Sequence, residues 1–157
     1  MARALRFVTL TALLLGAIAL GACGGDSDRE AKNTYVRELN AAQQEFAANA
    51  SKVSQNGKAG SVGQYRLTVE RFEDTIGKFA TKLRAIEVPS AVEAEHKQLI
   101  AALTGFGADF KKAAEVLKNP STRAVSEAKN ALSTATQRAN ASIEAAAAAI
   151  DSKLKDT

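Results

Sequence analysis

The spacing of apolar residues after residue 30 constrains the fold of this chain more than any other feature. In four successive segments they recur every three or four positions, which is a seven-residue repeat with two apolar positions. A helix presents residues at this spacing along one face, and such faces pack helices nearly parallel, about 20° off axis. The apolar positions are Tyr35, Leu39, Ala42, Phe46, Ala50 and Val53; Val69, Phe72, Ile76, Phe79, Leu83 and Ile86; Val92, His96, Leu99, Leu103, Phe106, Phe110, Ala113 or Ala114, and Leu117; and Val125, Ala128, Leu132, Ala135, Ala139, Ile143, Ala146, Ile150 and Leu154.

Helix-breaking residues separate the four segments. They occur as NGKAGSVG at 56–63, VPS at 88–90 and NPS at 119–121. The last two connections are short, so the helices they join should be antiparallel neighbours. The sequence therefore predicts an all-α fold, an antiparallel up-down-up-down four-helix bundle over residues 30–157. Helices of about 25 residues would make it roughly 37 Å long.

Capping residues are consistent with these boundaries. Ser90 and Glu93 have the spacing of a capping box at the start of the third helix. Asn119 can cap the fourth helix with Pro120 at its first position, or Ser121 can cap it instead. We therefore expect both helices to begin within a residue or two of these positions.

Composition narrows the classes of function. Phe72, Phe79, Phe106 and Phe110 should place most aromatic volume between the second and third helices, since alanine lines the fourth. The formal net charge is +4, the charges are interspersed and tryptophan is absent. This pattern argues against nucleic-acid binding, which uses clustered basic and aromatic residues.

The first 23 residues have the pattern of an export signal. MARALR carries two positive charges, and the fourteen residues FVTLTALLLGAIAL are too few for a membrane span of about 20. Leu20, Gly21, Ala22 and Cys23 follow, and together they resemble the lipobox of bacterial lipoproteins. The alternatives are a permanent helical anchor and an ordinary secretory signal with a free cysteine.

The lipobox resemblance implies a lipid attachment at Cys23. In that family a diacylglyceryl group is added to the cysteine sulfur and residues 1–22 are removed as a signal peptide. The chain has only one cysteine, which fits this use because no disulfide partner exists. We expect residues 23–29 to be a lipidated flexible tether reaching at most roughly 25 Å.

His96 is the only histidine and lies on the apolar face of the third segment. With Glu93 it makes a Glu-x-x-His pair, but a two-iron bundle site needs two such pairs. We therefore expect a hydrogen-bonded core histidine, no metal site and no cofactor. No serine or cysteine is placed to act with it as a nucleophile, so no catalytic residue is predicted.

Two further groups of residues allow alternative interpretations. Glu70, Glu73 and Asp74 could bind a cation or do acid-base work if buried, but a solvated charged face is the expectation. Gly77, Gly105 and Gly107 interrupt predicted helices. These glycines indicate either close packing between helices or neutral sequence drift that the fold tolerates. The alternative is a kink or a cavity that admits a ligand.

The function predicted from sequence is that of a non-enzymatic lipoprotein. It would be held on a bacterial cell membrane or outer membrane, facing the periplasm or the exterior, as an interaction or structural module of the envelope. Its partners would be the membrane and an envelope protein, without nucleic acid. The alternative is a sensor or carrier in which the bundle holds a small molecule near Gly77 and Gly105. A pocket of about 300 Å³ or more inside the bundle, between the second and third helices, would favour the alternative.

Overall fold

The computed structural model describes residues 26–57 and 60–155, and these residues are almost entirely helical. The elements are α1 (Asp26–Asn56), α2 (Val62–Arg84), the short 3-10 helix η1 (Ser90–Val92), α3 (Glu93–Val116) and α4 (Thr122–Lys155). The described ranges contain no strand. The predicted all-α class and the number of long helices are confirmed.

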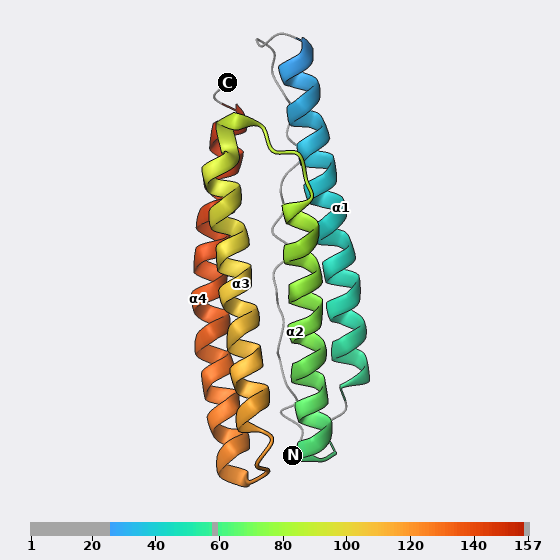
Figure 1. The fold of residues 1–157 in the computed structure, drawn as a ribbon, viewed down its shortest axis with the longest axis vertical. Coiled ribbons are helices and arrows are strands. Elements are labelled where there is room, and N and C mark those ends of the chain that lie inside the picture. The colour runs from blue at the N-terminus through green and yellow to red at the C-terminus, as the bar shows by residue number, and fades with distance from the viewer. Residues whose placement is uncertain (1–25, 58–59, 156–157) are drawn as a thin grey trace.

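The four helices lie side by side along one direction (Figure 1), which is consistent with a helical bundle. Each helix packs most closely against the next in the chain, and α4 also contacts η1. In Figure 1 the α1–α2 and α3–α4 connections lie at one end and the α2–α3 connection lies at the other. The molecule is therefore an elongated rod whose ends are formed by different connections.

The apolar faces predicted from the sequence form the core. All of the predicted apolar positions are buried or half-buried. The core divides along the rod into three clusters. Near the α2–α3 connection lie Tyr35, Leu39, Leu83, Leu103, Ile150 and Leu154, in the middle Ile76, Phe106, Ala135 and Ala139, and toward the other end Tyr65, Val69, Leu117 and Leu132.

The phenylalanines are divided between two interfaces. Phe110 lies between Phe72 and Phe106, with ring centres 5.8 and 5.0 Å away, which places three rings at the contact of α2 with α3. Phe79 instead stacks on Phe46 of α1 at 4.7 Å. Phe79 therefore joins α2 to α1, whereas the sequence predicted it at the contact of α2 with α3.

The first helix begins earlier than predicted. Residues 26–29 were expected to belong to a flexible tether, but they are the start of α1. Residues 27–31 are exposed, and in Figure 1 the start of α1 extends past the end of α2. The first and last helices are also longer than the predicted length of about 25 residues, with 31 residues in α1 and 34 in α4. The sequence Asp-Ser-Asp-Arg-Glu continues the helix because it contains no breaker, and acidic residues favour a helix N-terminus.

The helix caps show that the capping box predicted at Ser90 is wrong, and they decide between Asn119 and Ser121 as the cap of α4. Ser90 does not cap α3, because Ser90–Val92 forms the 3-10 turn η1 and Val92 precedes α3 without a side-chain cap. Ser121 caps α4, with its Oγ accepting from the Ala124 N–H at 3.0 Å, so the Asn119 alternative is not used. Ser61 caps α2 in the same way, accepting from the Gln64 N–H at 3.2 Å.

These caps predict different costs for three serines. Ser121→Ala and Ser61→Ala should each lower the free energy of unfolding by about 1 kcal/mol, since each leaves a helix N–H without its acceptor. Ser90→Ala is the matched control and should change it by less than about 0.5 kcal/mol. Urea unfolding followed by circular dichroism measures all three. A Ser90 variant as costly as the Ser121 variant would contradict the assignment.

Candidate functional site

A hollow of about 880 Å³ lies along α2 and is bordered by α3 and by Glu45 of α1. Ile76 and Ala80 of α2 and Leu103 of α3 supply its apolar lining. Gly77 and Gly107 also line it, and their missing side chains leave room at the surface. The hollow is open to solvent, so it differs from the pocket inside the bundle that the ligand-binding alternative required.

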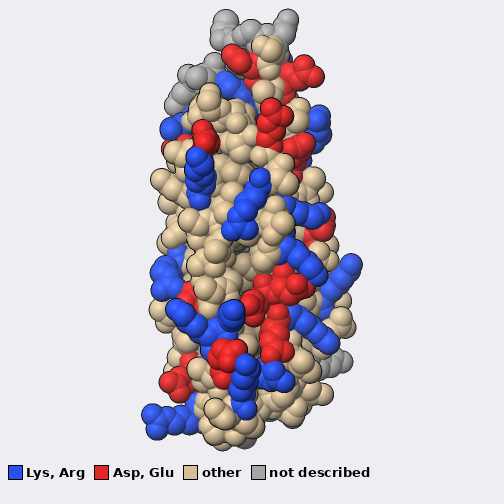
Figure 2. All heavy atoms as spheres, viewed as in Figure 1, with Lys and Arg blue, Asp and Glu red and all other residues tan. Residues whose placement is uncertain are grey.

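Charged residues surround this hollow in a definite order along α2. The acidic residues Glu70, Glu73 and Asp74 lie before Gly77, and the basic residues Lys78, Lys82 and Arg84 lie after it. Figure 2 shows the face that carries α2 and α3, where groups of acidic and basic side chains lie beside one another. The predicted solvated charged face is therefore present, and its charges are ordered by sign along α2.

Several of these charges have partners within the chain. Asp74 pairs with Lys78 one turn later at 2.6 Å, and Lys82 pairs with Glu45 of α1. Arg84 donates to the Thr104 hydroxyl of α3 at 2.8 Å. These side chains are exposed, so each ion pair adds about 1 kcal/mol or less. These pairs therefore position the side chains around the hollow and contribute little to the stability of the fold.

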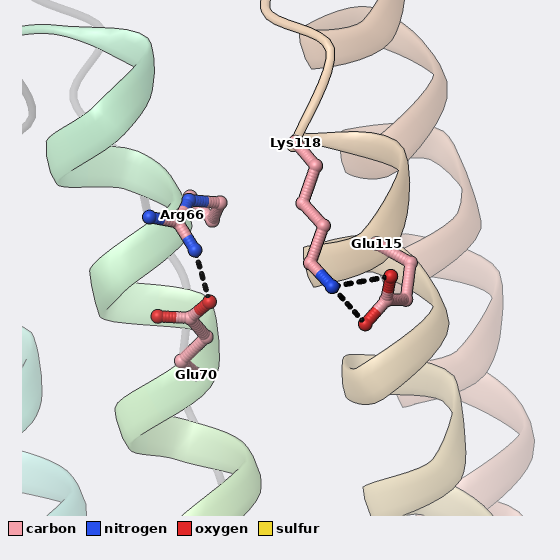
Figure 3. Close-up of polar contacts among 4 residues, drawn as sticks. All are labelled: Arg66, Glu70, Glu115 and Lys118. Atoms are coloured by element: carbon pink, nitrogen blue, oxygen red, sulfur yellow. Dashed lines mark hydrogen bonds and ion pairs between the residues drawn. The ribbon is translucent and has the colours of Figure 1, made fainter.

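A second charged group lies between α2 and the end of α3. Arg66 pairs with Glu70 at 2.5 Å on α2, and Glu115 faces them from α3 with both carboxylate oxygens on Lys118 (Figure 3). The hydrogen bond from Lys118 lowers the pKa of Glu115, with smaller electrostatic contributions from Lys111 and Arg66. Glu115 therefore stays ionised at neutral pH.

The interior glycines have no close contact that requires them. A side-chain carbon added at Gly77 or Gly105 would meet nothing within 4 Å, and one at Gly107 would lie 3.5 Å from Ile76. Close helix packing inside the chain therefore does not explain Gly77 or Gly105. Gly77 and Gly107 line the hollow whereas Gly105 does not.

The open space beside Gly77 and Gly105 predicts that alanine at either position makes the protein more stable than glycine does. Gly77→Ala and Gly105→Ala should each raise the free energy of unfolding by about 1 kcal/mol, because alanine loses less conformational entropy in a helix. Gly107→Ala should raise the free energy of unfolding by no more than either of these variants, because its added carbon contacts Ile76. Thermal unfolding of the three variants tests this, and a loss of stability at Gly77 would show an unseen contact there.

His96 is a buried core residue, as predicted, and it joins three helices. It is 3 % exposed, and its Nε2 lies 2.9 Å from the Leu83 carbonyl oxygen in the last turn of α2. A carbonyl can only accept, so Nε2 carries the hydrogen and Nδ1 of the neutral ring is an acceptor. The hydroxyl of Tyr35 on α1 donates to Nδ1 at 2.9 Å. Both ring nitrogens are therefore occupied within the core.

Burial also changes the titration of Tyr35. Loss of solvent raises the pKa of its phenol from 10.0 to about 12. The folded value exceeds the unfolded value, so the neutral phenol's contribution to stability is complete below pH 10 and is lost as the pH rises toward about 12.

An alkaline titration of the two tyrosines therefore has an expected shape. Absorbance of the phenolate should appear later in the folded protein than in urea, because burial raises the pKa of both Tyr35 and Tyr65. Tyr35→Phe should remove the later of the two steps. A folded protein in which both phenols titrate near pH 10 would contradict the burial of Tyr35.

The Glu93–His96 pair does not gather other ligands. Glu93 pairs with Lys97 at 2.5 Å, and the hydrogen bond from Lys97 lowers its pKa. Within the described ranges no group of three or more His, Cys, Asp or Glu residues is placed to hold a metal ion. The two residues therefore serve separate structural contacts here.

Ion pairs also join α3 to α4. Glu95 in the first turn of α3 contacts Lys153 at 2.8 Å, and the hydrogen bond from Lys153 lowers the pKa of Glu95. Asp109 pairs with Arg138 further along. Sequence spacing gave no sign of these pairs, since their members are separated by a connection and several turns. They fix the register of the two helices rather than forming a site.

The predicted lipid site lies outside the described residues, since Cys23 and residues 1–22 precede Asp26. In the part of the chain that is described, no helix combines the length and apolar character needed to cross a membrane. Comparisons with family models, curated proteins and solved structures find no match to this chain.

Proposed function

We propose that this protein is a bacterial lipoprotein, anchored through lipid on Cys23, whose helices act as a non-enzymatic interaction or structural module of the cell envelope. The helices would form an up-down-up-down four-helix bundle, and the alternating ends of the connections in Figure 1 support this topology. The observation that carries the proposal is the sequence Leu20-Gly21-Ala22-Cys23, three residues before α1 starts.

In this proposal the lipid determines where the protein acts. A single acyl chain gives marginal membrane binding, whereas the two chains of a diacylglyceryl group hold firmly. Only Gly24 and Gly25 separate Cys23 from α1, so the helix would begin close to the bilayer surface. The exposed start of α1 would then hold the packed part of the molecule away from the lipid, where the charged hollow on α2 can meet a protein partner.

Mass spectrometry of the protein purified from bacterial membranes tests the anchor. We expect a chain that begins at Cys23 and carries a diacylglyceryl group, and we expect uptake of a labelled fatty acid that Cys23→Ser abolishes. Ser27→Cys in the Cys23→Ser chain is the matched control, because it keeps one cysteine nearby and should take up no label. A purified chain that retains residues 1–22, or a bare thiol at position 23, would refute the proposal.

A small-molecule carrier or sensor is the second candidate, favoured by the hollow beside Gly77 and Gly107. Native mass spectrometry would detect a small molecule that co-purifies with the protein. The carrier function requires that Gly77→Phe displaces this molecule and that Gly105→Phe, which lies outside the hollow, does not. The open, charged rim favours a protein partner as the first candidate, because small-molecule sites bury most of their ligand in a concave pocket.

A further inference from the structure

A second hollow, of about 510 Å³, lies where α2 ends and α3 begins, and we call it the end hollow. Its apolar lining is formed by Ile86 and Val88 of the α2–α3 connection and by Ile100 of α3. Its volume is within the range of about 300–1,000 Å³ that ligand pockets have. The end hollow therefore has room for a small ligand.

The apolar surface of the end hollow is accessible, unlike that of the hollow on α2. Ile86, Val88 and Ile100 are half-buried, so each keeps part of its side chain in contact with solvent. The three apolar residues that line the hollow on α2 are only 1–3 % exposed. A hydrocarbon chain that covers apolar surface is stabilised by removing it from water. Of the two hollows, the end hollow therefore offers a chain the larger apolar contact.

His96 also lines the end hollow, but its ring has no free hydrogen-bonding group to offer a ligand. Nδ1 accepts from the Tyr35 hydroxyl and Nε2 donates to the Leu83 carbonyl, each at 2.9 Å. The ring therefore extends the apolar wall, and any polar recognition must come from the charged residues at the rim.

The charged residues of the end hollow leave one positive charge unbalanced. Lys97 pairs with Glu93 at 2.5 Å. Arg84 forms no ion pair with any described residue, and its Nη2 donates to the Thr104 hydroxyl at 2.8 Å. A guanidinium has five N–H donors, so Arg84 keeps most of them for a ligand. A planar carboxylate matches this group in charge and in geometry.

We infer that the end hollow binds a fatty acid, with the carboxylate on Arg84 and the hydrocarbon chain across Ile86, Val88 and Ile100. A fatty acid carries one negative charge and one flexible apolar chain, which are the two properties that the hollow complements. An alkyl phosphate fits less well, because it brings up to about two negative charges to a rim with one unbalanced positive charge. The inference does not require a lipid on Cys23.

The position of the end hollow suits such a ligand. It lies at the end of the rod from which α1 starts (Figure 1). If the chain also carries the proposed anchor, this end is the one nearest to the bilayer, into which fatty acids partition. The protein would then take its ligand from the membrane to which it is attached.

Photochemical labelling of the full-length chain in phosphatidylcholine vesicles tests this site, at a mildly alkaline pH that keeps the carboxylate ionised. The probe is palmitic acid with a diazirine on its chain. We expect mass spectrometry to find the label mainly on residues 86–100. A probe with the same chain and a trimethylammonium headgroup should label these residues at least about tenfold less, since its charge has the same sign as that of Arg84.

Substitutions in the end hollow separate the contribution of the charge from that of the apolar lining. Arg84→Met should lower labelling of residues 86–100 by the fatty acid at least about tenfold, because it removes the charged hydrogen bonds to the carboxylate. Arg84→Lys keeps the charge and should stay within about threefold of the natural chain. Val88→Asp places a carboxylate against the hydrocarbon chain and should also lower labelling.

Matched controls make the same changes outside the end hollow. Arg71→Met on α2 and Val116→Asp at the end of α3 alter exposed residues and should leave labelling unchanged. Circular dichroism confirms that each variant is folded. The Cys23→Ser chain should label as the natural chain does, so failure of the anchor proposal is a separate result. If the two headgroups label residues 86–100 equally, or if folded Arg84→Met labels like the natural chain, the inference is wrong.

Discussion

Phe79→Ala is expected to lower the free energy of unfolding by about 3–5 kcal/mol. Phe79 is 8 % exposed and stacks on Phe46 at 4.7 Å. The truncation removes a buried ring and also leaves Phe46 without its partner, so α1 loses its main aromatic contact with α2. Urea unfolding followed by far-ultraviolet circular dichroism gives the difference directly.

Two comparisons make this result specific. Phe72 is only half-buried, so Phe72→Ala should have the smaller effect. Phe46→Ala should have a smaller effect in a chain that already carries Phe79→Ala than in the natural chain, because the stacking contact is then gone. An unfolding curve that Phe79→Ala leaves unchanged would show that this ring does not belong to the core.

His96→Ala should lower the free energy of unfolding by roughly 2–4 kcal/mol, since it leaves a cavity and removes the acceptor of a buried hydroxyl. Tyr35 is 0 % exposed, so its hydroxyl cannot turn to water when Nδ1 is absent. The Leu83 carbonyl still accepts from the Ile86 N–H at 3.2 Å, so most of the polar loss falls on Tyr35.

A double-mutant cycle isolates the hydrogen bond between these two residues. Tyr35→Phe alone should cost about 1–2 kcal/mol, because it leaves Nδ1 of His96 without a donor. In the His96→Ala chain the same change should cost nothing, or should stabilise, because it removes the unpaired hydroxyl. Equal costs in both chains would show that the two residues do not interact.

The sequence predicted the elements of this fold well because they depend on local pattern. Residues at three- and four-residue spacing share a helix face whatever the tertiary structure, and Leu39, Ile76 and Ile150 are buried as that rule requires. The connections also lie where glycine and proline end the pattern. The buried histidine was predicted because it lies on such a face, although its partner Tyr35, 61 residues away, could not be identified.

What the sequence did not predict depends on choices between nearly equal local structures and on distant contacts. Ser90 has the spacing of a cap, but Pro89 and the following residues form a 3-10 turn, with the Val92 N–H on the Pro89 carbonyl at 3.0 Å. Predicting the hollow on α2 would require knowing which helix faces no other helix covers. Single-sequence periodicity indicates the apolar face of each helix, but it does not show which of the other faces a neighbouring helix covers.

The exposed beginning of α1 has a consequence for how the protein could leave a surface. Residues 27–31 make no contribution to the core, so their helix is held only by its own backbone hydrogen bonds and opens easily. A trypsin-like protease that cuts after Arg29 during such an opening would leave Tyr35 and every core cluster intact. If the proposed lipid anchor on Cys23 is present, this single cut would release a folded domain without its lipid, whereas a cut within α2 or α3 would disrupt the core.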